Sequence, residues 1–206
     1  MESLKQININ VENKYFFFRR CLELLSIFLV SPLILILFLI LTFIVFIDLR
    51  RNIIYKQIRV GMNGKPFTMY KFRTMKECPK YRNDYFAHQK ERVTKLGDFL
   101  RKHKLDELPQ VWNVMKGDMS IIGPRPEMIE AYFYFLNSIP DYSKRKIIPQ
   151  GITGWAQVNY NHTMSVEGNS RKLEFDIFYI NNLSLKLDLI ILIKTMKTVF
   201  TGNNSE

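Results

Sequence analysis

The most prominent pattern along the chain is a run of apolar residues near the N-terminus. From Leu24 to Ile47 the sequence reads LLSIFLVSPLILILFLILTFIVFI and contains no charged residue. At ~1.5 Å per residue, a helix of this length extends for roughly 36 Å, which is enough to cross ~30 Å of hydrocarbon. The run is too long for a cleaved signal peptide, and no small-residue cleavage site follows it. We therefore expect residues 21–50 to form a membrane-resident helix, preceded by a juxtamembrane segment over 1–20.

Two arrangements of this helix in the membrane are open. Basic residues mark the cytoplasmic side of a membrane segment, but here they flank both ends, so charge assigns no orientation. Ser31-Pro32 lies inside the run, and a proline removes a backbone donor and disfavours a straight helix. A neighbouring serine hydroxyl can satisfy the carbonyl that this leaves free. The residues alone allow either a re-entrant helix broken at Ser31-Pro32 or a kinked helix that spans the bilayer.

The pattern after the membrane run predicts a small β-hairpin followed by helices. Residues 53–60 and 65–72 alternate apolar and polar side chains around Asn63-Gly64, a strong turn signal. Short helices are expected over 94–101, with Thr94 as the cap, from Asp106 to a stop at Gly117, and over 128–137. The sequence thus predicts an α+β fold: a mostly helical, membrane-associated domain with a small β-hairpin.

The boundaries of this domain follow from the same pattern. A cytosolic, membrane-surface domain is expected over 51–200 and a disordered tail over 201–206. Residues 77–92 are polar and predict a loop with exposed helix, and residues 147–159 have the Gly and Pro density of an ordered loop. The stretch from about 173 to 200 is expected to be helical, with Ser184 capping its last part. Its mixed apolar and lysine pattern fits a helix at a lipid surface or one packed on the domain core.

The net charge of the chain limits the kinds of partner that the domain is expected to bind. The chain carries 30 Lys and Arg against 19 Asp and Glu, a formal net charge of +11. Such a surplus indicates anionic partners: nucleic acid, lipid head groups or phosphorylated substrates. No nucleic-acid motif, Walker loop or GxGxxG accompanies the charge, so nucleic acid is not expected as a partner. Two cysteines without CxxC spacing favour a reducing, cytosol-facing domain.

The best candidate for chemistry is the acidic pair Asp106-Glu107. One interpretation is structural, because Asp is a favoured helix N-cap and Glu suits a first helical turn. The other is catalytic: basic residues precede the pair, Arg101 among them, and Arg125 follows in a GPRP sequence. An acidic pair bracketed by cations is typical of a phosphate site where a metal ion and arginines neutralise the substrate.

An aspartate attacking a phosphate needs help with charge. At an ordinary pKa of ~3.9 it is ionised at neutral pH, so no general base is required. Two unit charges ~4 Å apart cost ~4 kcal/mol at an effective dielectric of ~20, and a diphosphate adds more than one such interaction. A helix N-terminus returns only ~0.3–1 kcal/mol. If Asp106 attacks phosphorus, a divalent cation such as Mg²⁺ is therefore expected to supply the remaining stabilisation, together with arginine.

At these residues the chain resembles the bacterial sugar transferases, the monotopic phosphoglycosyl transferases that begin lipid-linked glycan assembly. The resemblance runs from the membrane segment nearly to the C-terminus, with the same order and spacing of motifs. Besides Ser31-Pro32, they are RVGMNGKPF (59–67), YKFRTM (70–75), LRKHKLDELPQVWNVMKGDMSIIGPRPE (100–127), PQGITGWAQVN (149–159) and FDIFYINNLSLKLDL (175–189). The 100–127 motif is highly specific. The chain resembles the short, stand-alone form of the family.

The resemblance implies a fold feature and a reaction. The membrane helix would enter and leave on the cytoplasmic face, with its break at Ser31-Pro32. Asp106 would attack the β-phosphate of a UDP-sugar, release UMP and carry the phosphosugar. Undecaprenyl phosphate, or another polyprenyl phosphate, would then accept it. Glu107 would act beside Asp106, with Mg²⁺ near the pair.

It also implies the substrate-binding residues and the setting of the reaction. Pro124, Arg125 and Pro126 would lie against the nucleotide. Lys71 and Arg101 would bind phosphate, and Arg73 is expected to join them in substrate binding. The enzyme would sit in the bacterial cytoplasmic membrane, with its catalytic domain on the cytoplasmic face and membrane lipids and downstream glycosyltransferases as partners.

Two other functions compete with this one. A non-catalytic protein could use the same scaffold to bind polyprenyl phosphate or recruit assembly enzymes, which the intact Asp106-Glu107 pair argues against. A hydrolase would let water resolve the intermediate, which the lipid-facing elements disfavour. Product analysis separates lipid diphosphosugar, no product and free sugar phosphate.

Overall fold

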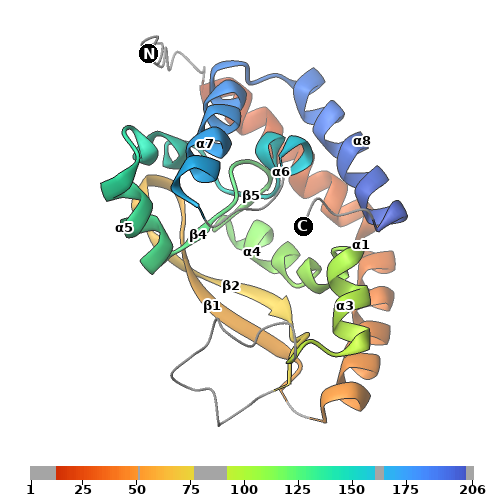
Figure 1. Cartoon of the computed structure of the whole chain (residues 1–206). Coiled ribbons are helices and arrows are strands. Elements are labelled where there is room, and N and C mark those ends of the chain that lie inside the picture. The colour runs from red at the N-terminus through yellow and green to blue at the C-terminus, as the bar shows by residue number, and fades with distance from the viewer. Residues whose placement is uncertain (1–12, 51, 77–91, 161–164, 203–206) are drawn as a thin grey trace.

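The computed structural model describes residues 13–50, 52–76, 92–160 and 165–202. It shows a helical domain with two small sheets, built along one long N-terminal helix (Figure 1). This confirms the predicted mixture of many helices and a small β-structure. The predicted loop over 77–92 lies almost entirely outside the described residues, and so does all of the predicted tail beyond Gly202.

Helix α1 spans Asn13–Leu49 and, in the described part of the chain, is the one helix long and apolar enough to cross a membrane. It starts before the expected boundary at residue 20, and it continues through Ser31 and Pro32 instead of breaking there. The reason is local. Pro32 has no N–H for the Phe28 carbonyl, and Ser31 Oγ donates to that carbonyl at 2.7 Å. The helix is preserved, and its axis changes direction near the middle (Figure 1).

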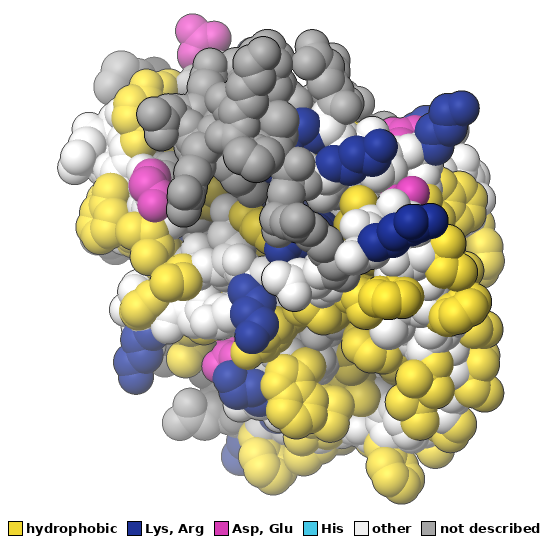
Figure 2. Space-filling view, turned by 90° about the horizontal axis from the view of Figure 1, so that it is seen from below, with side chains coloured by type: hydrophobic (Ala, Val, Ile, Leu, Met, Phe, Trp, Pro, Cys, Tyr) yellow, Lys and Arg dark blue, Asp and Glu magenta, His cyan; other side chains and the backbone are white. Residues whose placement is uncertain are grey.

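One stripe of α1 packs on the rest of the domain along almost the whole helix. Its buried positions recur at helical spacing: Arg19, Glu23, Ile27, Leu41 and Val45. The other faces are covered with exposed Leu, Ile, Val and Phe side chains. Figure 2 shows hydrophobic side chains gathered along the right-hand edge of the molecule, the side on which α1 lies. Thus α1 is attached to the domain by one face and presents an apolar surface on the others.

Polar contacts attach the N-terminal part of α1. Arg19 donates to Ser120 Oγ at 2.6 Å, and Glu23 accepts from the Ile121 backbone N–H at 3.1 Å. Arg20 donates to the Val114 carbonyl at 2.6 Å, in the last turn of a following helix. Buried charges that are paired and hydrogen-bonded fix geometry, so these contacts set the position of α1 against the domain.

The predicted hairpin is confirmed. Strands β1 (Ile54–Val60) and β2 (Pro66–Phe72) pair antiparallel, with Ile54 opposite Phe72. At the turn, Asn63 has φ 55° and Gly64 has φ 77°, the left-handed backbone that Asn-Gly adopts readily. Strand β4 (Glu127–Met128) pairs with the other edge of β1.

The next helices follow the sequence signals closely. Helix α3 (Lys95–Lys102) is capped by Thr94, whose Oγ1 accepts from the Gly97 N–H at 2.9 Å. The 3₁₀ turn η3 (Leu105–Glu107) connects it to α4 (Gln110–Lys116). Gly117 ends α4 in the left-handed conformation, as predicted from its position. Helix α5 (Ile129–Ser138) occupies the predicted range.

A two-stranded parallel sheet joins two distant motifs. Strand β3 (Ser120–Ile122) pairs with β5 (Gly151–Thr153), so residues 147–159, expected to be a loop, contain a strand and the short helix α6 (Trp155–Asn159). The backbones approach so closely that a Cβ at Gly151 would lie 2.1 Å from the Gly123 nitrogen. Only glycine fits there.

Three further elements complete the domain: the 3₁₀ turn η4 (Tyr142–Lys146) and helices α7 (Val166–Asn181) and α8 (Leu185–Thr201). Ser184 caps α8 as predicted, accepting from the Leu187 N–H at 3.3 Å. Ile191 of α8 is fully buried in a core cluster, while Ile193 and Phe200 are exposed. Helix α8 therefore packs on the core with one face and exposes apolar side chains on another.

Candidate active site

The acidic pair Asp106-Glu107 lies in η3, between α3 and α4. Lys104, just before the turn, has φ 55°, and this left-handed residue redirects the chain after α3. Asp106 is not an N-cap: the cap position of α4 is Pro109, and no side chain caps either η3 or α4. The prediction that Asp106 caps the helix is therefore wrong. Its carboxylate is buried and does not serve the helix end.

Two cations from distant parts of the chain converge on Glu107. Lys71 Nζ, from β2, lies 2.8 Å from Glu107 Oε1, and Arg125 Nη2, from the loop after β3, lies 2.7 Å from the same oxygen. Lys71 Nζ is 4.0 Å from Asp106 Oδ2, beyond hydrogen-bonding distance. Four of the predicted site residues, Lys71, Asp106, Glu107 and Arg125, thus form one cluster, in which Glu107 is the fully paired carboxylate.

Because Glu107 is closer to the two cations than Asp106 is, the pKa values of the two carboxyl groups shift in opposite directions. Burial alone would raise the pKa of Glu107, but Arg125 and Lys71 outweigh it and hold that pKa well below its usual range. The pKa of Asp106 is raised, first by burial and then by the neighbouring Glu107 charge, against the opposing effect of Lys71. The ordinary Asp pKa assumed from the sequence therefore does not hold at this site. A further positive charge beside Asp106 would favour its ionised form.

The backbone of Pro124, Arg125 and Pro126 is held at each carbonyl. The Pro124 carbonyl accepts from the Gly151 N–H at 2.9 Å, and the Arg125 carbonyl accepts from Arg145 Nη2 at 3.3 Å. Arg59 Nη1, from β1, donates to the Pro126 carbonyl at 3.2 Å. These three bonds fix the segment and aim the Arg125 side chain at Glu107.

Arg145 is a residue that sequence reasoning missed. It is completely buried, with Nη1 2.6 Å from Glu127 Oε1 and Nη2 2.7 Å from Asp176 Oδ2. Lys172 also pairs with Glu127, at 2.7 Å. In the sequence, Arg145 belongs to the basic run SKRK, a pattern typical of a solvated surface. The buried ion-pair cluster behind the Pro124–Pro126 segment therefore has no local signal.

The other predicted basic residues make different contacts. Arg73 Nε donates to the Asn52 carbonyl at 2.9 Å, and Arg101 Nε donates to Thr74 Oγ1 at 2.9 Å. These bonds attach both residues to the end of the hairpin and not to the acidic pair. Their substrate-binding role stays a prediction.

The donor set at the pair suits Mg²⁺ in part. Mg²⁺ is commonly held by one or two carboxylates, with substrate phosphates and waters completing the octahedron. Asp106 and Glu107 supply two adjacent carboxylates, and within the described residues no group of three or more His, Cys, Asp or Glu gathers into a fuller cage. A cation here would thus depend on substrate oxygens for its remaining ligands.

Comparison with known proteins matches residues 14–202 to the family described as bacterial sugar transferase. A UDP-N-acetylgalactosamine-undecaprenyl-phosphate N-acetylgalactosaminephosphotransferase of Aeromonas hydrophila is 39% identical over 189 residues, covering 91% of this chain and 45% of the relative. A UDP-glucose:undecaprenyl-phosphate glucose-1-phosphate transferase of Escherichia coli is 42% identical over 153 residues, covering 73% and 32%.

An uncharacterized sugar transferase, EpsL, of Bacillus subtilis is 41% identical over 150 residues, covering 73% of this chain and 71% of the relative. The chain thus spans less than half of the Aeromonas and Escherichia proteins and most of the Bacillus one. The family match contains the acidic pair, both of its cationic partners and most of α1. The chain therefore belongs to the bacterial sugar transferase family.

Proposed function

We propose that this protein transfers a sugar 1-phosphate from a UDP-sugar to undecaprenyl phosphate, or a similar polyprenyl phosphate, as the first membrane step of a glycan pathway. The observation that carries the proposal is the buried Asp106-Glu107 pair with Lys71 and Arg125 around it. The family and the names of the relatives support the donor and acceptor classes.

In the first step, an Asp106 carboxylate oxygen would attack the β-phosphorus of the UDP-sugar. A bond forms between that oxygen and phosphorus, the anhydride bond to the α-phosphate breaks, and its electron pair leaves with UMP. Charge repulsion opposes the approach by ~4 kcal/mol for each unit charge ~4 Å away at an effective dielectric of ~20. Lys71, 4.0 Å from Asp106 Oδ2, and Arg125, which shares Glu107 Oε1 with Lys71, are the cations that would offset this repulsion.

In the second step, a phosphate oxygen of the polyprenyl phosphate would attack the phosphorus of the aspartyl phosphosugar. A new anhydride bond forms, the bond to Asp106 breaks, and the carboxylate returns to its starting state. Dividing the transfer in this way lets a soluble donor and a lipid acceptor use the same site in turn.

Asp106 and Glu107 make different ion pairs, and we assign them different roles on that basis. Glu107 anchors the two cations, Lys71 and Arg125, while Asp106 makes only a longer ion pair, 4.0 Å from Lys71 Nζ, and would present its carboxylate for attack. Asp106 and Glu107 would also hold Mg²⁺, which supplies electrostatic stabilisation of the diphosphate and favours ionised Asp106. Lys71, Arg125 and the fixed Pro124–Pro126 backbone would orient the donor.

The packing of α1 supports attachment to one membrane face. A crossing helix would carry the domain into the hydrocarbon with it, because α1 contacts the domain from Arg19 to Val45. We propose instead that α1 enters the bacterial cytoplasmic membrane from the cytoplasmic side and returns, bent near Pro32. The exposed apolar face of α8 would lie against the same lipid surface.

The test is UMP release by purified protein in detergent with Mg²⁺, undecaprenyl phosphate and a panel of UDP-sugars. The names of the relatives place UDP-N-acetylgalactosamine and UDP-glucose first in that panel. Release with one donor, with continued turnover only when lipid is present, is the expected result. Free sugar phosphate would indicate a hydrolase, and no release from folded protein with any donor would indicate a non-catalytic role.

A further inference from the structure

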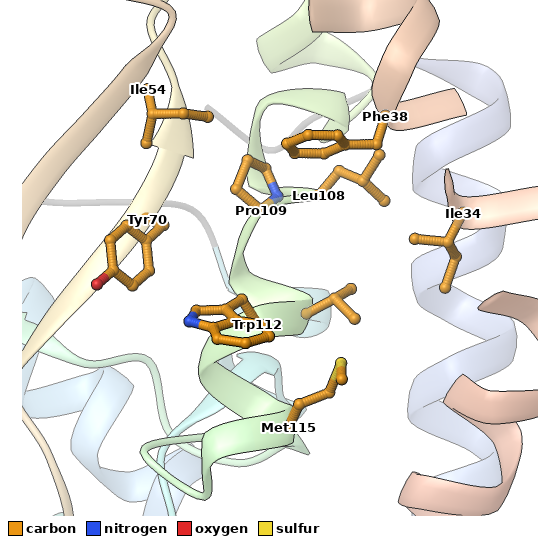
Figure 3. A pocket seen from close by; sticks show the side chains of 9 residues that line it. Ile34, Phe38, Ile54, Tyr70, Leu108, Pro109, Trp112 and Met115 are labelled. Atoms are coloured by element: carbon orange, nitrogen blue, oxygen red, sulfur yellow. The ribbon is translucent and has the colours of Figure 1, made fainter. Parts of the chain in front are cut away.

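The two faces of the β1–β2 hairpin have different surroundings. Ile54 and Tyr70 line an apolar cavity between the hairpin, α1 and α4 (Figure 3). Lys71, the next residue of β2, points to the opposite face, because side chains alternate along a strand, and there it pairs with Glu107. The hairpin thus separates an apolar side from the side that carries the acidic pair.

Arg59 lies on the same side of the hairpin as Lys71. Tyr55 is directly opposite Lys71 in the antiparallel pair, and opposed residues share a face. Arg59 is an even number of residues further along β1, so the alternation returns its side chain to that face. Its Nη1 donates to the carbonyl of Pro126, the residue after Arg125, at 3.2 Å. Arg59 therefore adds a third cation to the side of the hairpin that faces the acidic pair.

Arg59 pairs with no carboxylate among the residues that the structure describes. Its Nε and Nη2 donate to Gln57 Oε1 at 3.1 and 2.6 Å, and its third bond goes to the Pro126 carbonyl, so both acceptors are neutral. An arginine has five N–H donors, and three bonds leave two of them for a ligand. Burial and the neighbouring charge of Arg125 lower the pKa of Arg59 to about 10. The position therefore favours an anion, and arginine can donate two parallel bonds to a phosphate.

The arrangement of the cations fits the two phosphates of the donor. In the proposed first step, the β-phosphorus lies at Asp106, whose carboxylate is 4.0 Å from Lys71 Nζ. Arg125 shares Glu107 with Lys71, and Arg59 is held at the residue that follows Arg125. A diphosphate with one phosphate at Asp106 therefore has a cation available for the other.

The chemistry of the proposed reaction gives this second phosphate position two occupants in turn. In a displacement at phosphorus, the attacking and leaving oxygens lie roughly in line. Asp106 would attack opposite the α-phosphate of the donor. The acceptor phosphate would later attack opposite Asp106, so it enters where the α-phosphate has left.

We propose that Arg59 binds the phosphate that is not transferred: the α-phosphate of the UDP-sugar in the first step and the acceptor phosphate in the second. This inference rests on the proposed function. When the anhydride bond breaks, its electron pair leaves on the α-phosphate, and Arg59 stabilises that added charge. In the second step the same guanidinium orients the attacking phosphate oxygen. Gln57 fixes the guanidinium for both steps.

Two substitutions test this role in different ways. Arg59→Gln removes the charge and the bond to Pro126 together. Gln57→Glu keeps an oxygen that accepts from Arg59 but adds a carboxylate, so the arginine stays in place and its charge is neutralised. Lys56→Gln is the matched control, because Lys56 is an exposed cation of the same strand on the opposite face.

Two properties are measured for each protein in detergent with Mg²⁺. The first is the dissociation constant of UMP, and of uridine as the ligand without phosphate, by titration calorimetry. The second is kcat/KM for undecaprenyl phosphate, which in a two-step transfer reports the reaction of the phosphosugar enzyme with its acceptor. A general distortion of the site would weaken UMP and uridine alike, whereas loss of a phosphate contact weakens UMP alone.

Arg59→Gln and Gln57→Glu are both expected to raise the UMP dissociation constant ~10–100-fold, as for the loss of a charged hydrogen-bonding contact. The uridine constant should stay within about twofold of wild type, and kcat/KM for the acceptor should fall at least ~10-fold. Lys56→Gln should leave all three values unchanged. If Arg59→Gln does not fold, Gln57→Glu, which keeps the Pro126 bond, decides alone.

Three results would overturn the role of Arg59: unchanged UMP affinity in the variants, an equal loss of UMP and uridine affinity, or an acceptor kcat/KM equal to that of Lys56→Gln. Wild-type protein that releases no UMP from any UDP-sugar would instead refute the proposed function, and the inference with it.

Discussion

Glu107→Gln is the most informative single change at the site, because it keeps the shape of the side chain and removes its charge. The Glu107 carboxylate accepts from Lys71 at 2.8 Å and from Arg125 at 2.7 Å, and all three groups are largely buried. Removing one partner of a buried ion pair typically costs ~3–5 kcal/mol, because the remaining charge is left without compensation. The pKa of Glu107, held well below its usual range, points the same way.

This cost is measurable as thermal stability. For a chain of this size, ~1 kcal/mol corresponds to a shift of ~2–4 °C in the unfolding midpoint, so a fall of roughly 6–20 °C is expected. Intrinsic fluorescence of Trp112 and Trp155 during heating in detergent reports it. Asp98→Asn is the matched control: its pair with Lys102 is more than half exposed, and such pairs contribute only ~0–1 kcal/mol. If Glu107→Gln melts within a degree or two of wild type, the buried cluster does not exist as described.

Three further predictions concern the buried ion pairs behind the site, the close packing of β3 on β5 and the arrangement of α1 in the membrane. Arg145→Met should lower the free energy of unfolding by ~3–5 kcal/mol in a denaturant titration, because it leaves the buried Asp176 carboxylate without its ion pair and Glu127 with Lys172 alone; an unchanged midpoint would contradict the buried cluster. Gly151→Ala should cost at least ~1–3 kcal/mol by the same titration, because its Cβ would collide with the Gly123 backbone; wild-type stability would disprove that close approach. Cysteines at Lys14 and Lys56, in a background without native cysteines, should both react with an impermeant label from the cytoplasmic side; labelling from opposite sides would show a spanning helix.

The sequence predicted those elements whose cause is local. The hairpin at Asn63-Gly64, the Thr94 and Ser184 caps and the Gly117 stop each depend on backbone preferences of a few residues, and the structure confirms them. The Ser31 hydroxyl also bonds the carbonyl that Pro32 leaves free, as its position indicated. Because that bond repairs the helix, the expected break is a bend within a continuous helix.

Features that depend on distant contacts could not be predicted in this way. Asp is a residue type favoured at helix N-caps, but Asp106 does not occupy that position. The left-handed residue Lys104 and the turn η3 place Asp106 before the start of α4, where Pro109 is the cap residue. The burial of Arg145 depends on carboxylates far away in the sequence, and a basic run gives no sign of it. The pairing of β3 with β5 is non-local as well, so its second strand was expected to be loop.

The central claim is that Asp106 carries the phosphosugar, and intact-protein mass measurement tests it most directly. Wild-type protein is incubated with Mg²⁺ and its UDP-sugar without acceptor, and the reaction is quenched. The intact mass is then measured by mass spectrometry, and the protein is digested for peptide analysis. We predict a mass increase equal to one sugar phosphate, located on the peptide that contains Asp106, absent from Asp106→Asn and lost when undecaprenyl phosphate is added. A wild-type protein that turns over with both substrates but never gains this mass, or an Asp106→Asn variant with near-wild-type turnover, would contradict the covalent mechanism.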